Sequence, residues 1–216
     1  MKGKDLFWGS MITPIIAIGS YGSSWAVPQT TGQEVVAAEK VADFIHSVIE
    51  ADRTLYTTHV VQRMQKNEIV KADENWKREA ALPLPAQMMA LAGLRVKGKG
   101  TGLEHRLISL WPIYEKNRPA SEFEIIGLEA VAVDPTKPYT GTIKKDGRHY
   151  FQAIYADKAV SLSCLNCHNN HPLSPKQDYK LNDVMGGIVI SFPLSQNQND
   201  SETASLNAKP PNREEQ

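Results

Sequence analysis

The stretch from Gln33 to Met64 contains no glycine or proline, and this constrains the fold more than any other feature of the sequence. Its apolar residues recur at intervals of three and four, which is typical of an amphipathic helix: Val41, Ala42, Ile45, Val48, Ile49, Leu55, Tyr56 and Val60. We predict one helix over residues 32–66, capped by Thr30 or Thr31. At about 1.5 Å per residue it is roughly 50 Å long. So long a helix must pack along another part of the protein or along a second copy, which makes a homodimer one hypothesis.

The remainder of the chain carries both helix and strand signals. Proline and glycine limit a short helix to residues 85–92, and a helix over 121–133 has Ser121 as N-cap with Glu124 as capping-box partner. Strands are predicted over 103–111, 140–144, 149–155 and 185–192, the middle two flanking the turn signal Asp146-Gly147. Gly186-Gly187 fits a bulge or a close backbone approach at the head of the last strand. We expect an α+β domain with an antiparallel sheet.

The two ends of the chain differ from this central part. Residues 1–26 combine Lys2 and Lys4, an apolar stretch from Leu6 to about Ile18, and Ser24-Trp25-Ala26, which is the pattern of a secretory signal peptide. The alternative, a membrane anchor, would need a longer apolar run. We therefore expect export to a bacterial periplasm, no stable membrane span after cleavage, a folded domain over 27–194, and a disordered polar tail over 195–216.

The composition is that of an ordinary folded protein and excludes some partners. Hydrophobic residues make up 41% and charged residues 22% of the chain. Lys plus Arg number 24 and so do Asp plus Glu, so the formal net charge is zero. Because nucleic-acid binding relies on a basic excess, we expect no nucleic-acid partner.

Residues 164–168 read Cys-Leu-Asn-Cys-His and contain both cysteines of the chain. This is the C-x-x-C-H attachment signature of a c-type haem. We expect thioether bonds from Cys164 and Cys167 to one haem c, and His168 as an axial ligand of its iron. The alternatives are a zinc site, which lacks a second cysteine pair, a thioredoxin-like redox pair, which lacks good helix residues after it, and a structural disulfide.

Several segments, taken in order, resemble a known family. They are Ile108-Ser109-Leu110-Trp111-Pro112, Asn117-Arg118-Pro119, Phe123-Glu124, the C-x-x-C-H segment and residues 184–190. This order resembles the PAS-like c-type haem domain, found as a periplasmic sensor domain and as a free-standing protein. The resemblance spans roughly residues 34–194 and implies a PAS-like antiparallel sheet, long N-terminal helices and one haem c. With no signalling module after the haem segment, we expect the free-standing type.

The sixth iron ligand decides between functions, because a strong ligand favours electron transfer and an open site allows ligand binding. The resemblance implies a distal ligand from the N-terminal helical part, where the candidates are His46, His59, Met64, Met88 and Met89. At about 100° per residue, His59 falls in the middle of the apolar stripe, so it is the leading candidate; an open iron is the alternative. Tyr56 is a candidate for the distal pocket, and Arg106 and Arg118 are candidates for binding the haem propionates.

Three functions follow from these expectations. The first is an exported monohaem c-type cytochrome that transfers electrons to a redox partner protein or senses redox state. The second is a sensor of a diatomic gas or another small ligand at an open or displaceable distal site. The third, a haem enzyme, has the least support because no catalytic pair is visible in the sequence.

Overall fold

The computed structural model describes residues 35–194 of the chain. The predicted signal peptide, the caps Thr30 and Thr31 and the C-terminal tail lie outside these residues. The helices and strands are α1 (Ala38–Leu55), η1 (Tyr56–Gln62), α2 (Arg63–Lys66), α3 (Pro85–Lys97), β1 (Glu104–Ile108), η2 (Glu115–Asn117), α4 (Glu122–Val133), β2 (Tyr139–Lys145), β3 (Arg148–Lys158), α5 (Leu162–Asn170) and β4 (Val184–Pro193). None of the helices within 35–194 is long and apolar enough to cross a membrane.

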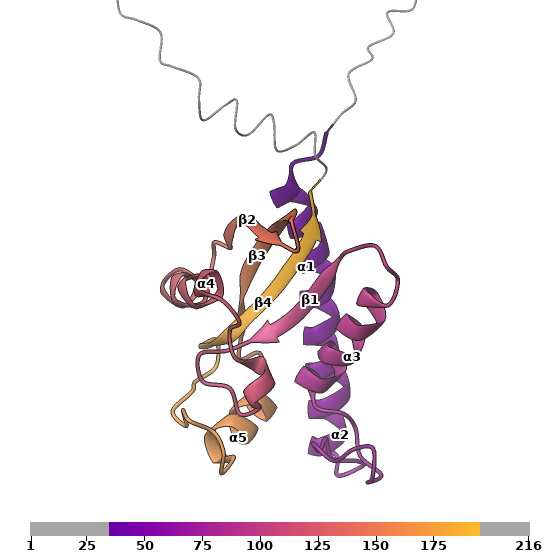
Figure 1. Ribbon diagram of the computed structural model, residues 1–216. Coiled ribbons are helices and arrows are strands. Elements are labelled where there is room, and N and C mark those ends of the chain that lie inside the picture. The colour runs from indigo at the N-terminus through magenta and orange to yellow at the C-terminus, as the bar shows by residue number, and fades with distance from the viewer. Residues whose placement is uncertain (1–34, 195–216) are drawn as a thin grey trace, which may run out of the picture. The chain divides into compact units, whose positions relative to one another are not determined.

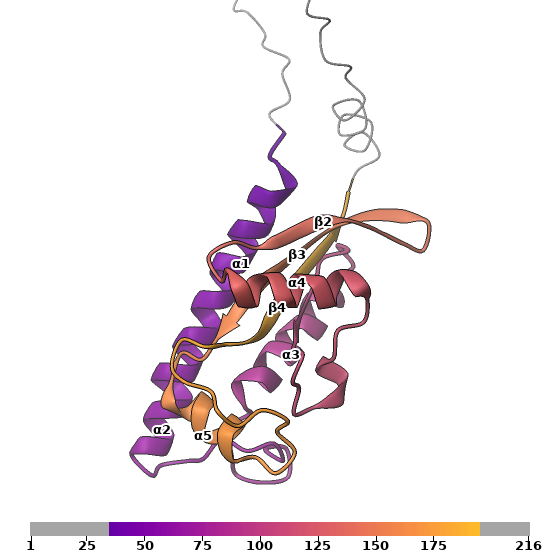
Figure 2. The same ribbon diagram turned by 90° about the vertical axis from the view of Figure 1, so that its left-hand side faces the viewer.

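The four strands form one antiparallel sheet in the order β1-β4-β3-β2. Helices α1 and α3 lie on one face and α4 on the other, while α5 lies beyond the end of the sheet where β3 finishes and β4 begins (Figures 1 and 2). The predicted α+β class is confirmed. The likeness to PAS domains stays a prediction.

Alternating side chains of the central strands build a separate core on each face. Phe151, Ala153 and Tyr155 of β3 join Ile188 and Ile190 of β4 on the α1 face. Their neighbours in the two strands, Ile154 and Val189, face α4 instead. This period of two is the reason that one strand sequence can bury apolar side chains on both faces.

Local signals in the second half of the chain predicted its elements well. Ser121 Oγ accepts a hydrogen bond from the Glu124 amide at 3.3 Å and so caps α4. Asp146 and Gly147 both have positive φ values in the β2–β3 turn, as a two-residue hairpin turn requires. At Gly186, a Cβ would lie 2.3 Å from the Ile108 carbonyl oxygen, so the predicted close approach between β4 and β1 is confirmed.

One helix end was predicted wrongly, and one helix was not predicted. We expected Gly93 to end the helix that begins at Pro85, but α3 continues through it to Lys97. An added Cβ at Gly93 would lie 2.5 Å from the His105 carbonyl oxygen, so this glycine lets α3 approach β1 closely. The residues after Cys167 were judged poor helix formers, yet α5 continues to Asn170 because Asn169 is held by tertiary hydrogen bonds to Tyr179.

The N-terminal helix is continuous from Ala38 to Lys66, but it is not uniformly α-helical. Its packed side carries Ala38, Ala42, Ile45 and Ile49. Two other residues of the predicted stripe, Val48 and Leu55, are exposed, as is the nearby Phe44. The stripe is therefore wider than the buried face. The homodimer stays a prediction.

From Tyr56 to Gln62 the helix becomes a π-helix. A π-turn holds more residues than an α-turn, so each residue rotates less about the axis. Arg53, Thr57 and Val61, at intervals of four, consequently all remain on the buried side. A helical wheel drawn with a constant rotation per residue therefore does not predict which side chains of this segment are buried.

Candidate haem site

The C-x-x-C-H segment forms most of α5, which joins β3 to the long loop before β4 (Figure 1). Cys164 and Leu165 pack against a small apolar cluster of Ala159, Tyr179 and Met185. In an α-helix, residues three and four apart share a face. Helix formation over Leu162–Asn170 therefore places Cys164, Cys167 and His168 on one side of α5.

Both cysteines are free thiols and both are partly buried. The Cys164 sulfur lies 3.5 Å from Ser161 Oγ. Burial raises the pKa of the Cys167 thiol, and the nearby Cys164 and Glu74 add to the shift.

The His168 ring lies edge-on to Tyr179, with the ring centroids 5.8 Å apart. Burial lowers the pKa of His168 to about 4, and the positive charges of Arg53 and His171 act in the same direction. The imidazole is therefore neutral at physiological pH, which is the form that binds a metal. Its Nδ1 atom is buried and has no hydrogen-bond partner among the described residues.

Two contacts fix α5 to its surroundings. The Asn169 side chain accepts a hydrogen bond from the Tyr179 amide at 3.0 Å and donates one to the Tyr179 carbonyl at 2.9 Å. His171 Nε2 lies 3.7 Å from Glu74 Oε2, so the loop between α2 and α3 reaches the end of α5. These contacts hold α5 at the end of the sheet that also carries the C-terminal end of α1.

A buried ion pair lies between that end of α1 and the end of β3. Arg53 Nη2 donates a hydrogen bond to Asp157 Oδ2 at 3.0 Å and lies 2.8 Å from Oδ1, and each residue is 8% exposed. Burial raises the pKa of Asp157, and Arg53 opposes this shift. Asp157 precedes α5 by a few residues, and η1, which follows Arg53, packs against α5.

Unsatisfied polar atoms concentrate around α5. Within residues 35–194, five buried side-chain atoms have no hydrogen-bond partner: His46 Nε2, Arg53 Nε, Gln152 Oε1, His168 Nδ1 and Tyr179 Oη. Three of these atoms belong to His168, Tyr179 and Arg53. The Tyr179 ring is perpendicular to the His168 ring, and the positive charge of Arg53 lowers the pKa of His168. Because buried polar groups are normally paired, such a concentration indicates a polar ligand at this place.

The donor set fits a covalently bound haem. Two thiols and a neutral imidazole on one face of a helix match what the C-x-x-C-H signature uses. Within the described residues, no group of three or more His, Cys, Asp or Glu side chains is arranged around a common point that could hold a metal ion. Haem attachment needs no such convergence, since the thiols bond to the porphyrin and the imidazole to the iron.

The leading candidate for the sixth ligand, His59, is exposed, and its Nδ1 lies 2.7 Å from Thr58 Oγ1. His59 lies on the exposed side of η1, whereas we expected it on the packed face. The smaller rotation per residue in this π-helical segment accounts for the difference. Met89 is 2% exposed within the core under the sheet, while Met64 and Met88 are partly buried. The partly buried His46 ring stacks on Tyr155 at 3.9 Å.

Tyr56, the candidate for the distal pocket, and Arg118, a candidate for binding a propionate, have protein partners. Tyr56 donates its hydroxyl hydrogen to the Pro83 carbonyl at 2.7 Å and so ties η1 to the segment before α3. Arg118 pairs with Glu115 at the surface. The structure therefore gives both side chains partners other than the expected haem groups.

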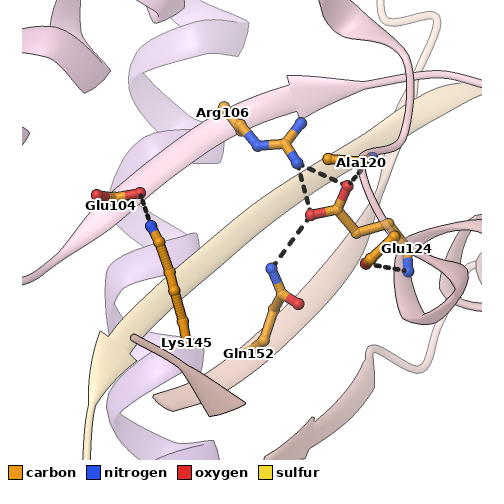
Figure 3. Close-up of polar contacts among 7 residues, drawn as sticks. Glu104, Arg106, Ala120, Glu124, Lys145 and Gln152 are labelled. Atoms are coloured by element: carbon orange, nitrogen blue, oxygen red, sulfur yellow. Dashed lines mark hydrogen bonds and ion pairs between the residues drawn. The ribbon is translucent and has the colours of Figure 1, made fainter. Parts of the chain in front are cut away.

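Arg106 has a partner on α4 instead of the expected haem propionate. Its Nη2 donates to both oxygens of Glu124, at 2.5 Å and 2.6 Å (Figure 3). The same carboxylate accepts hydrogen bonds from the Ala120 amide at 2.7 Å and from Gln152 Nε2 at 3.3 Å. Glu124 is 3% exposed, so this network fastens α4 to β1 and β3.

Sequence reasoning missed three residues of the site: Arg53 as a buried charge, Asp157 and Tyr179. No local pattern marks Asp157 or Tyr179, because they reach α5 through the ends of β3 and of the loop before β4. The unusual π-helical segment also had no signal in the sequence.

Comparison with known proteins gives a family. No curated protein sequence matches this chain. One crystal structure is similar, that of the cyanobacterial heme-protein Tll0287, with 13% sequence identity and a TM-score of 0.41 over 74% of this chain and 99% of that chain. The family model described as Tll0287-like matches residues 32–193, which is most of the chain. The chain therefore belongs to the Tll0287-like family.

Proposed function

We propose that this protein is an exported monohaem c-type cytochrome that transfers electrons or senses redox state. Haem is bound through thioether bonds to Cys164 and Cys167, with His168 as the axial ligand. The observation that carries the proposal is the C-x-x-C-H face of α5, on which His168 is neutral and its buried Nδ1 is unpartnered. The name of the family supports it, since Tll0287 is described as a heme-protein.

The chain's own residues would orient and shield the cofactor. Tyr179 and Asn169 hold α5 and the edge of the His168 ring, and Ser161 lies beside Cys164. When bound, the haem supplies reversible one-electron chemistry at its iron. The signal-peptide pattern of residues 1–26 supports export to the periplasm, where the haem is attached.

Attachment is tested by expressing the full chain with a c-type haem maturation system. We expect the purified protein to gain the mass of one haem and to give a c-type pyridine haemochrome. Cys164→Ser with Cys167→Ser should abolish covalent haem. His171→Ala is the matched control, since this histidine lies in the same segment but pairs with Glu74. Wild-type protein that matures without bound haem would disprove the proposal.

A second function, sensing of a diatomic gas or another small ligand, is favoured by one observation. His59, the leading candidate for the distal ligand, is exposed and close to Thr58. Optical spectra with and without carbon monoxide separate the two functions. Low-spin bands that ignore the gas favour electron transfer or redox sensing, whereas high-spin bands or a prompt shift favour ligand sensing. His59→Ala then tests that side chain directly, because loss of a ligand converts a low-spin spectrum to high spin.

A further inference from the structure

The buried guanidinium of Arg53 is only partly used by the protein. Arginine has five N–H donors, yet its hydrogen bond and its short ion-pair contact with Asp157 both come from the single nitrogen Nη2. The Nε atom is buried and has no partner among the described residues. An unpaired donor on a charged, buried side chain is unfavourable, so its retention calls for an additional acceptor.

The position of Arg53 indicates where that acceptor belongs. Arg53 lies in the last turn of α1, shortly before η1, and η1 packs against α5. The charge of Arg53 acts on His168, the proposed axial ligand. The missing acceptor therefore lies at the same end of the sheet as the C-x-x-C-H helix.

The chemistry of the cofactor supplies such an acceptor. Haem carries two propionates, and a guanidinium matches a carboxylate better than any other side chain does. The two arginines that we expected to serve this purpose, Arg106 and Arg118, are engaged by Glu124 and Glu115. Arg53 is held in place but retains a free buried donor.

We infer that Arg53 binds a haem propionate, and that Asp157 positions its guanidinium for this contact. The inference rests on the proposed haem attachment. It assigns Arg53 as a cofactor-binding residue and Asp157 as a positioning residue.

The test uses full-length, haem-loaded protein carrying Arg53→Gln, with Arg106→Gln as the matched control. Haem attachment is first verified by mass, since a wild-type protein without covalent haem contradicts the proposed function and not the role of Arg53 alone. The propionate-bending band of the resonance Raman spectrum and the reduction potential are then measured at one pH.

In Arg53→Gln we expect a shifted propionate band and a reduction equilibrium constant about tenfold lower, equal to about 59 mV for one electron. The sign follows because removing a positive charge leaves the propionate negative and so favours the oxidised iron. Arg106→Gln should leave the band and the potential unchanged. A normal band and potential in Arg53→Gln would overturn the inference.

Arg53→Lys keeps the experiment decisive if the glutamine variant does not fold. Lysine retains the charge but loses the planar fork of donors. We expect a shifted propionate band with a potential close to that of the wild type. An unchanged band in this variant would also overturn the inference, because a contact with the propionate must respond to the change of donor.

Discussion

Two arginine–carboxylate pairs, each with a buried carboxylate, have different roles in the protein. In the first, Arg106 and Gln152 donate to Glu124 together with the Ala120 amide, so the carboxylate is surrounded by donors (Figure 3). In the second, Arg53 donates to Asp157 from one nitrogen and leaves Nε unpaired. We call the first pair complete, because its buried carboxylate is surrounded by protein donors, and the second incomplete, because its buried arginine keeps an unpaired donor.

The difference separates a structural contact from a binding contact. Glu124 accepts hydrogen bonds from two strands and from the residue before the N-cap of its own helix, so it stabilises the attachment of α4. Arg53 has a carboxylate to fix its position and a remaining donor beside α5. Buried polar groups that are fully paired hold a fold together, whereas an unpaired one marks a place where something else binds.

Removing the complete pair should have the largest effect on stability. Glu124→Ala leaves Arg106, Gln152 and the Ala120 amide without their acceptor. We expect the free energy of unfolding of the haem-loaded protein to fall by about 3 kcal/mol, as measured by urea denaturation, with the haem still attached.

Glu129→Ala is the control for this variant, because Glu129 is an exposed carboxylate on the same helix. Its effect should stay within about 0.5 kcal/mol. If both variants destabilised the protein equally, the network around Glu124 would contribute nothing beyond helix propensity.

Breaking the incomplete pair should cost less in the haem-loaded protein. Asp157→Asn removes the protein carboxylate, but Arg53 keeps the proposed propionate as a partner. We expect a loss of about 1–2 kcal/mol, measured in the same denaturation experiment. A loss as large as that of Glu124→Ala would mean that Arg53 has Asp157 as its sole anionic partner.

The smallest expected effect is the pH dependence of stability that comes from buried histidines. Neither arginine–carboxylate pair contains a histidine, so this pH dependence is separate from both pairs. Burial lowers the pKa of His105, and a hydrogen bond to the Met89 backbone opposes this shift. The unfolded chain, whose histidines titrate near about 6.5, then binds more protons than the folded protein below that pH. Stability should therefore fall as the pH falls below about 6.5.

The measurement is the free energy of unfolding between pH 7 and pH 5, in the wild type and in His105→Gln. Burial lowers the pKa of His46 as well, so the variant should reduce the slope and not remove it. Identical slopes in the two proteins would show that His105 takes up its proton equally well when folded and unfolded.

The accuracy of the sequence predictions followed the range of the interactions involved. The β2–β3 hairpin and the N-cap at Ser121 were predicted correctly, because Asp146-Gly147 and Ser121 act on their immediate neighbours. The end of α3 was predicted wrongly, since Gly93 continues a helix in order to approach His105 on another element. The buried face of the long helix was predicted wrongly for a similar reason. Apolar residues lie on several sides of this helix, and contact with the sheet buries only one of these sides.

By itself, the sequence determined the α+β class, the antiparallel strands and the C-x-x-C-H segment, because each depends on residues close together along the chain. The tertiary structure alone decided which polar groups surround that segment. Arg53 and Asp157 lie far apart in the sequence and meet only when α1 packs along β3, and the π-helical turn after Arg53 keeps Thr57 and Val61 on its buried side. Burial and pairing are properties of three-dimensional packing, so no local pattern revealed that one arginine is satisfied and the other is not.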